Sequence, residues 1–364
     1  MSIVHGGNVY EIASRLGCSP EALLDYSASI NPLGPPPGLQ ERLNDIFCRL
    51  QHYPDIGSSA LTEALACYHG VPQSRVAVGN GSTELIYWLP RAFGVKRAAV
   101  VLPTFGEYAR AFEIQGVELT PLFTSAENGF QPTVAELDAL FQHSAPDAIL
   151  FTHPGSPSGL PLPQPVCRWI LEKSAAGGLT CIVDEVFVDF CEEESLKGFL
   201  DRSPSLALIR SMTKFYGIPG LRLGYVLASE ESIRRLRALV PPWSVNTLAQ
   251  AAGVYCMMQE DYRQETLTLV NAERERCRSL LESVGGIRVF PGRANYLLAE
   301  LEKELPPVSV LREELLTARQ VLIRDCSSFD GLTDHHFRLA IRLPHQNDVV
   351  MEGIKRWVEA YRSS

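Results

Sequence analysis

Short apolar runs alternate with amphipathic stretches through the middle of the chain. Each run is four to eight residues long, as expected for strands that are buried on both faces. The stretches between several of them, such as STELIYWLPRAF, EYARAFEIQ and PQPVCRWILEKSA, have the spacing of amphipathic helices. This alternation predicts a mainly parallel sheet covered by helices on both faces. The expected strands are 75–78, 98–102, 148–152, 180–187, 206–211 and 223–228.

The pattern changes after the segment PPWSVN (241–246), where longer helical stretches begin with short apolar runs between them. This change predicts a second, smaller α+β domain. Near the other end, the first thirty or so residues finish in SINPLGPPPG, whose Pro and Gly content is typical of a linker. We therefore expect an α/β protein with a large domain over 36–245 and a small domain over 246–364. Residues 1–35 are expected to form an arm or part of the small domain.

Composition narrows the classes of partner. The formal net charge of -9 argues against nucleic acid or an anionic membrane surface as the main partner, because proteins that bind either one usually have a basic surface. No apolar stretch is long enough to span a bilayer, and the start MSIVHGG lacks the pattern of a signal peptide. The nine cysteines include no C-x-x-C pair, which favours reduced thiols over a metal site or disulfides. These features predict a cytoplasmic protein with no metal, nucleic-acid or membrane partner.

The segment AVGNGSTELIYW (77–88) has the pattern of a strand end, a glycine-bracketed turn and a helix start. Ser82 or Thr83 can cap that helix, and the exposed amides at its N-terminus can bind a phosphate. Such turns are common, and this one has neither the spacing of a nucleotide P-loop nor that of a dinucleotide fold. A phosphate site here therefore depends on partners elsewhere in the chain.

Two charged residues follow buried strands. Asp184 ends the apolar run in CIVDEVF, where a carboxylate is costly unless a cation meets it. Lys214 lies in SMTKFYGIPGLRLG (211–224), eight residues before Arg222. Taken singly, a salt-bridged structural aspartate and a solvated loop lysine are the simplest interpretations. Taken with the phosphate-binding turn, they indicate a nucleophilic lysine beside a heterocycle whose nitrogen Asp184 keeps protonated, since burial and a nearby arginine favour the neutral amine.

These motifs resemble the fold-type I pyridoxal-phosphate (PLP) enzymes, and the resemblance covers essentially the whole chain. It implies a PLP-dependent transferase fold whose large domain has a mainly parallel seven-stranded sheet. Lys214 in SMTK matches the lysine that binds the cofactor aldehyde, and Asp184 matches the partner of the pyridine nitrogen. Tyr108 in PTFGEYARA matches the aromatic residue that stacks on the ring, and these three residues are the expected catalytic set. The other cofactor-binding residues that the resemblance implies are Gly81, Ser82, Thr83, Ser156, Ser211, Thr213 and Arg222, together with Tyr53, which would reach the cofactor phosphate of the neighbouring subunit in a homodimer with shared active sites.

Two positions depart from the pattern of these enzymes. The motif N-N-P-T-G is replaced by GSPSG, so Ser156 stands where an asparagine usually binds the oxygen of the ring hydroxyl. Phe187 stands where a tyrosine often donates to the same oxygen. The ring hydroxyl is therefore expected to depend on Ser156, with a water between them.

Segments near the two ends narrow the resemblance. HGGN (5–8), LLDYSASINPLG (23–34) and FRLAIRLPHQN (337–347) are similar to signatures of the threonine-phosphate decarboxylases of cobalamin synthesis, which are close to the histidinol-phosphate aminotransferases. Arg338 matches the arginine that receives the α-carboxylate as a bidentate pair. Taken singly, Arg324 and Arg342 are explained nearly as well by strand-edge salt bridges. The implied substrate-binding residues are His5, Gly6, Gly7, Asn8, Asn31, Arg324, Arg338 and Arg342.

The resemblance implies a carboxy-lyase that converts L-threonine O-3-phosphate into (R)-1-amino-2-propanol O-2-phosphate. O-phosphoserine is an alternative substrate, because a single methyl group is weakly discriminated. The alternative activity is an aminotransferase of the histidinol-phosphate type, which would break the bond from Cα to hydrogen instead of the bond to the carboxylate. A PLP-fold sensor fused to a DNA-binding module is disfavoured by the acidic charge and by the lack of a helix-turn-helix extension.

Overall fold

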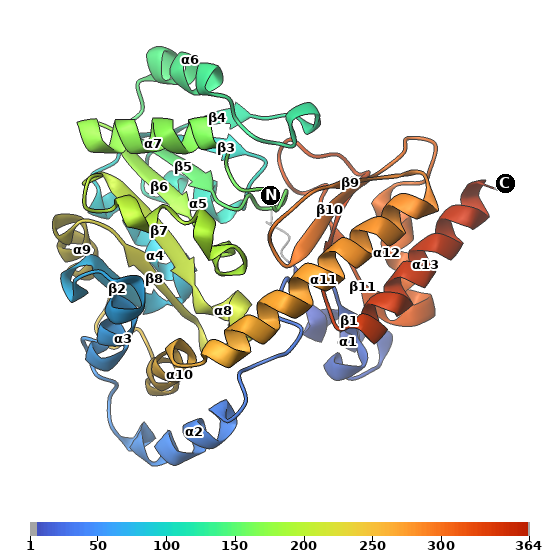
Figure 1. Cartoon of the computed structure of the whole chain (residues 1–364), viewed down its shortest axis with the longest axis horizontal. Coiled ribbons are helices and arrows are strands. Elements are labelled where there is room, and N and C mark those ends of the chain that lie inside the picture. Colours follow the sequence, from blue (N-terminus) through green and yellow to red (C-terminus); the bar gives the residue numbers. More distant parts are fainter. Residues whose placement is uncertain (1–5, 363–364) are drawn as a thin grey trace.

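A large and a small domain lie side by side and are bridged by one long helix, α11 (Glu260–Val284), as Figure 1 shows. The computed structural model describes residues 6–362. The large domain is built on a seven-stranded sheet in the order β2-β8-β7-β6-β5-β3-β4. Neighbouring strands from β7 through β4 are parallel, and β8 is antiparallel to both of its neighbours. The predicted α/β fold with a mainly parallel seven-stranded sheet is confirmed.

Six of the seven strands correspond to the apolar runs of the sequence. The seventh, β4, lies at the edge of the sheet, and its residues are exposed or half-buried. An edge strand covered incompletely does not need a continuous apolar run, so the hydrophobic pattern did not indicate it. The strands are β2 (Val76–Asn80), β3 (Arg97–Leu102), β4 (Glu118–Phe123), β5 (Ala148–Thr152), β6 (Thr180–Asp184), β7 (Leu206–Ser211) and β8 (Leu223–Leu227).

The sheet is buried on both faces. Along β6, Ile182 packs into the apolar cluster that contains α4, α5 and α9, whereas Cys181 and Val183 pack into the cluster that contains α3, α7 and α10. Successive strand residues point to opposite faces, so each strand supplies both clusters. The helices of this domain are α2 (Leu39–Ile46), α3 (Ser59–His69), α4 (Gly81–Ala92), α5 (Glu107–Ile114), α6 (Val134–Ser144), α7 (Gln164–Ala176), α8 (Met212–Phe215), α9 (Glu230–Arg237) and α10 (Thr247–Met257).

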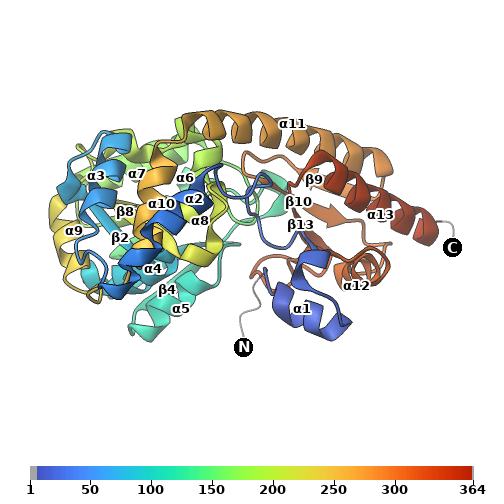
Figure 2. The ribbon, with the colours of Figure 1, turned by 90° about the horizontal axis from the view of Figure 1, so that it is seen from below.

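The small domain has an antiparallel sheet in the order β12-β13-β10-β9, packed against three helices. The N-terminal segment joins this domain, because β1 (Leu24–Asp25) pairs with β11 (Val321–Leu322) and α1 (Val9–Leu16) packs beside α12 (Figure 2). The remaining elements are β9 (Ile287–Phe290), β10 (Tyr296–Leu301), β12 (Arg324–Asp325), β13 (His336–Ala340), α12 (Val308–Arg319) and α13 (Pro344–Arg362).

Helix α10 packs with the large domain although the predicted boundary places residue 246 onward in the small domain. A Cβ atom on Gly253 of α10 would press into Leu61 of α3 and Leu223 of β8. The change of domain in the structure therefore lies nearer the start of α11 than the predicted boundary at 245/246, because the apolar face of α10 completes the large-domain core. Within residues 6–362, no helix is both long and apolar enough to cross a membrane.

Candidate active site

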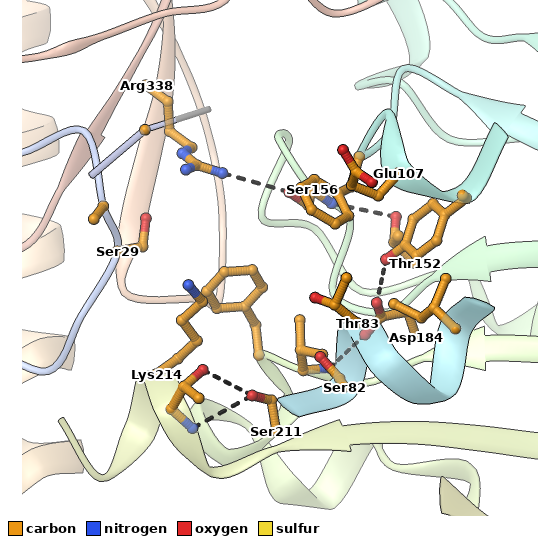
Figure 3. Close-up of a pocket in the computed structure, with 18 of the residues that line it drawn as sticks. Ser29, Ser82, Thr83, Glu107, Thr152, Ser156, Asp184, Ser211, Lys214 and Arg338 are labelled. Carbon is orange, nitrogen blue, oxygen red and sulfur yellow. Dashed lines mark hydrogen bonds between the residues drawn. The ribbon is translucent and has the colours of Figure 1, made fainter. Parts of the chain in front are cut away.

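A cavity of about 510 Å³ opens between the two domains, at the carboxyl ends of the parallel strands. Ligands bind at this edge in open α/β sheets. Figure 3 shows its walls, with Lys214 below Arg338 and Ser29, and with Asp184 across the cavity. Twelve of the residues predicted from the sequence line the cavity, namely Gly6, Ser82, Thr83, Tyr108, Ser156, Asp184, Ser211, Thr213, Lys214, Arg222, Arg324 and Arg338.

Lys214 is held on the short helix α8, directly after β7. Ser211 caps this helix, since its hydroxyl accepts from the Thr213 amide, and the carbonyl of Lys214 accepts from the backbone amide of Asn31 at 3.0 Å. Burial lowers the pKa of the Lys214 ammonium to about 8, and the cations Arg338 and Arg222 act in the same direction. The side chain is therefore a neutral amine, and a nucleophile, over part of the physiological range.

This lowered pKa predicts how PLP uptake by the cofactor-free protein depends on pH. With a pKa of about 8, only about a tenth of Lys214 is neutral at pH 7 and nearly all of it at pH 9.5. We expect the rate at which the visible band of the bound cofactor develops to rise about tenfold from pH 7 to pH 9.5, with its midpoint near pH 8. Stopped-flow absorbance measures this rate. A midpoint above pH 10 would show an amine with the ordinary lysine pKa.

Asp184 lies at the end of β6, and both of its carboxylate oxygens have partners. Oδ1 accepts from the Val186 amide at 2.8 Å, and Oδ2 accepts from the Tyr108 hydroxyl. Burial raises the pKa of Asp184 to about 7, against the opposing effect of these hydrogen bonds. The Tyr108 ring packs edge-on against Phe105, and its stacking on a cofactor ring stays a prediction. The carboxylate faces the cavity, where it can meet a protonated ring nitrogen.

A buried ionic cluster supports these strand ends from behind. Because strand residues alternate, Ser211 faces the cavity while Arg210 points to the other face. Arg210 is fully buried and forms ion pairs with Glu185 at 3.0 Å, Asp189 at 3.4 Å and Glu192 at 2.5 Å. The cluster therefore ties β7 to the segment that follows β6.

The N-terminus of α4 forms an anion cradle. Ser82 and Thr83 of its first turn line the cavity with Ser211, Thr213 and Arg222. Gly81 has φ +78, and a Cβ atom there would clash with the Arg222 guanidinium, so a glycine allows the arginine to lie against the start of the helix. Helix amides, hydroxyl groups and a guanidinium together are the donor set that a phosphate prefers.

These residues fit PLP. The cradle suits the phosphate, the amine of Lys214 can take the aldehyde, and the buried carboxylate of Asp184 suits the pyridine nitrogen. Each of these residues lines the same cavity.

Two arginines line the part of the cavity that the small domain contributes. Arg324 on β12 and Arg338 on β13 are directly paired in the antiparallel register. Arg338 donates to Ser156 Oγ at 3.4 Å and to the Ser27 carbonyl at 3.3 Å, and its guanidinium lies over the Tyr296 ring at 4.8 Å. Burial lowers the pKa of Arg324, and the neighbouring Arg338 adds to this effect. Two cations at one wall favour a ligand with anionic groups.

The loop with the sequence GSPSG, which replaces the usual motif N-N-P-T-G, is held by contacts around Ser156. The Tyr296 hydroxyl donates to the Gly155 carbonyl at 2.7 Å, and Phe187 packs edge-on against the Tyr296 ring at 4.9 Å. Ser156 Oγ accepts from Arg338. The substituted loop thus connects the cofactor side of the cavity to the substrate side. A water between Ser156 and the ring hydroxyl stays a prediction.

Some predicted residues lie away from the cavity. Asn31 is buried, and its side-chain amide donates to the Phe215 carbonyl, to Tyr262 and to Thr266, so it positions the segment beside Lys214 and does not face the cavity. Arg342 lies beyond the end of β13 and is not among the described residues that line the cavity. The predictions that Asn31 and Arg342 bind substrate therefore have no support from this geometry.

The N-terminal motif HGGN is divided in the structure. Gly6 lines the cavity, while the Gly7 amide donates to Ser27 Oγ at 2.8 Å and Asn8 is the N-cap residue of α1. His5 lies outside the described residues. A cavity role for Gly7 and Asn8 therefore stays a prediction.

Tyr53 lies on the surface, 80% exposed, and stacks on Trp243 at 4.8 Å. It does not line the cavity of its own chain. This position is compatible with its predicted role, which is to reach the cavity of a neighbouring subunit.

Several cavity residues were not indicated by the sequence. Ser27 and Ser29 lie in the segment YSASINP, but only Asn31 of that segment was selected. Glu107 precedes Tyr108 and is buried with its carboxylate bonded to the Tyr87 hydroxyl. These residues lie close in the chain to ones that the sequence did predict, but nearness in the chain does not show in which direction a side chain points. The missed lining residues are Ser27, Ala28, Ser29, Ile86, Phe105, Glu107, Thr152, Pro154, Val186 and Phe329.

Comparison with known proteins identifies the family of this chain. The family model described as aminotransferase class I and II matches residues 24–354. A threonine-phosphate decarboxylase of Salmonella typhimurium is 38% identical, over 96% of this chain and 95% of its own length. An adenosylcobalamin biosynthesis bifunctional protein of Leptospira interrogans is 29% identical over 96% of this chain, which spans 40% of that protein.

Two solved structures have the same fold. The L-threonine-O-3-phosphate decarboxylase of Porphyromonas gingivalis is 25% identical with a TM-score of 0.82, and it covers 93% of this chain and 100% of its own. The histidinol-phosphate aminotransferase of Clostridium acetobutylicum is 27% identical with a TM-score of 0.86 and the same coverage. The chain therefore belongs to the PLP-dependent class I and II aminotransferase family and, within it, to the group of the threonine-phosphate decarboxylases.

Proposed function

We propose that this protein is a PLP-dependent decarboxylase that converts L-threonine O-3-phosphate into (R)-1-amino-2-propanol O-2-phosphate and CO2 for cobalamin synthesis. The observation that carries the proposal is the pair Arg338 and Arg324, which line the same cavity as the Lys214 amine. A phosphorylated amino acid has an amine and two anionic groups, and this wall offers two guanidinium groups to receive them. The names of the relatives in the same group support the substrate.

The residues of the cavity then have distinct roles. Ser82, Thr83, Ser211 and Arg222 hold the cofactor phosphate, and Asp184 holds the pyridine nitrogen. When bound, PLP withdraws electrons from the substrate carbon that carries the amine and the carboxylate.

On the substrate side, Arg338 holds the α-carboxylate and so sets the direction of the bond that breaks. The bond between Cα and the carboxylate carbon breaks, CO2 leaves, and a proton is added at Cα. Lys214 has a pKa of about 8 and faces the cavity, so its amine is suited to carry that proton.

The test uses the PLP-loaded protein with L-threonine O-3-phosphate and no keto acid. Catalytic CO2 release, with aminopropanol phosphate identified by mass spectrometry, is the expected result, and O-phosphoserine tests the preference for the methyl group. The matched control is the Lys214→Ala protein, which should release no CO2. Conversion of the bound cofactor to pyridoxamine phosphate, with turnover only when 2-oxoglutarate is supplied, would establish the aminotransferase alternative and overturn the proposal.

We also propose that the protein is a homodimer with shared active sites, in which Tyr53 reaches the partner's cofactor phosphate. Its exposed ring stacks on Trp243, which lines a surface hollow together with the exposed Ile56, and this supports an apolar surface that a second copy would cover. Sedimentation should then give about twice the chain mass of 40.2 kDa.

Subunit mixing tests the sharing directly. We expect activity to be regained when the inactive Lys214→Ala protein and the weakly active Tyr53→Ala protein are unfolded and refolded together. Only the mixed dimer contains one site with both residues intact, so a random one-to-one mixture should recover about a quarter of the wild-type activity. A mixture no more active than the sum of its parts would show that Tyr53 does not act across the interface.

A further inference from the structure

Ser29 presents an unusual hydroxyl group to the cavity. The residue is 1% exposed and lines the cavity, yet Oγ has no hydrogen-bond partner among residues 6–362. Buried hydroxyl groups are nearly always hydrogen-bonded, because an unpaired one loses its bonds to water without replacement. An unpaired hydroxyl at a cavity wall is therefore a candidate donor to a ligand.

The neighbouring serine on the same segment differs in this respect. Ser27 Oγ donates to Asp25 Oδ1 at 2.6 Å and accepts from the Gly7 amide at 2.8 Å. Its hydroxyl is therefore used within the fold. The contrast indicates that the segment is held by its own hydrogen bonds, and that the hydroxyl group of Ser29 can still form a hydrogen bond with a ligand.

Arg338 connects this segment to the substrate side of the cavity. Its guanidinium donates to the Ser27 carbonyl and to Ser156 Oγ, both neutral oxygens, and its Nε is buried without a partner within the described residues. Figure 3 shows Ser29 and Arg338 on the same side of the cavity, with the Ser29 hydroxyl directed inward. A cation and a neutral hydroxyl donor on the same side of the cavity can together bind an oxyanion.

We propose that Ser29 Oγ donates a hydrogen bond to one of the two oxyanions of the substrate on the side of the cavity that Arg338 lines, and so helps to fix the orientation of the substrate. The inference rests on the proposed function, because that function supplies a substrate with a carboxylate and a phosphate. Both groups have acceptor oxygens of the same kind, so two ligands are needed to separate them. Ser29 then acts as a substrate-positioning residue in addition to the arginines.

The test measures ligand binding to PLP-loaded wild-type and Ser29→Ala proteins by calorimetry. L-Threonine has the carboxylate without the phosphate, and 1-aminopropan-2-yl phosphate has the phosphate without the carboxylate. We expect Ser29→Ala to weaken one of them by about tenfold or more, as for a hydrogen bond to a charged group, while the other changes less than twofold. The ligand that loses affinity identifies the oxyanion that Ser29 binds.

Two further variants separate a ligand contact from a structural role. Ser29→Cys keeps the size but donates weakly, so it should lose affinity as Ser29→Ala does, with unchanged cofactor absorbance. Ser27→Ala should lower Tm, because it leaves Asp25 and the Gly7 amide without their partner, whereas Ser29→Ala should leave Tm unchanged or higher.

Unchanged affinity of Ser29→Ala for both ligands would overturn the inference, and so would a fall in Tm as large as that of Ser27→Ala. Failure of the proposed function is seen separately, as absence of CO2 release by the wild-type protein.

Discussion

Lys214→Ala will lack the visible absorbance of covalently held PLP and will lose at least about 10⁴-fold in decarboxylation rate. The buried amine faces the cavity on a capped helix, and it is both the proposed nucleophile for the cofactor aldehyde and the proposed proton carrier. The absorbance spectrum of the reconstituted protein and single-turnover CO2 release measure the two effects independently. Added PLP should still bind non-covalently, because the phosphate cradle and Asp184 are intact.

The matched control is Lys355→Ala. Lys355 lies on the exposed side of α13 and is paired only weakly, at 4.0 Å, with Glu359. This variant should keep both the absorbance and the rate within twofold of wild type. Retention of the visible band in Lys214→Ala would show that another lysine holds the cofactor.

Asp184→Asn is expected to make the cofactor-free protein more stable and the loaded enzyme about 10²- to 10³-fold slower. The slowing follows because a neutral amide cannot keep the pyridine nitrogen protonated, and preorganised charges of this kind contribute rate factors of that order. The gain in stability follows because burial disfavours the Asp184 carboxylate, raising its pKa from 3.8 to about 7.

The raised pKa of Asp184 also predicts how the free energy of unfolding changes with pH. The unfolded chain loses the Asp184 proton near pH 3.8 and the folded chain near pH 7, so this residue's contribution to stability falls as pH rises between these values. The shift of about three pKa units corresponds to about 4 kcal/mol at most. Urea unfolding of the cofactor-free proteins should therefore show little advantage for Asp184→Asn near pH 4 and an advantage that grows until about pH 7.

A surface carboxylate provides the comparison for this variant. Asp201 is 85% exposed in its side chain and pairs with Arg75, so Asp201→Asn should change stability little and activity less than twofold. An Asp184→Asn protein that is less stable than wild type at pH 8 would show that the hydrogen bonds from Tyr108 and Val186 outweigh the cost of burying the charge.

Much of the cofactor side of the cavity could be predicted because its determinants are local. An apolar run that ends in Asp184, a lysine after the next strand and a glycine turn before a helix are each short segments. Parallel strands align their carboxyl ends at one edge of the sheet, so these segments converge once the α/β alternation is recognised. The resemblance to PLP enzymes rests on the same motifs and led to the fold, the cofactor and the family that the comparisons show.

The substrate side depends on contacts between residues far apart in the chain. Asn31 stands in a matching motif, but packing against α11 directs its side-chain amide into structural hydrogen bonds with Tyr262 and Thr266. Helix α10 likewise joins the large domain because of the apolar surfaces that it meets there.

By itself, the sequence determined six of the seven strands of the large sheet, the strand end that carries Lys214 and the acidic net charge, because these follow from local spacing and composition. Only the tertiary structure decided which polar groups remain unpaired at the cavity. Ser27 and Ser29 are two residues apart with the same side chain, and one is bonded to Asp25 and Gly7 while the other faces the cavity beside Arg338. A hydroxyl group becomes available to a ligand only when the folded chain buries it and supplies no partner, and no local pattern records that outcome.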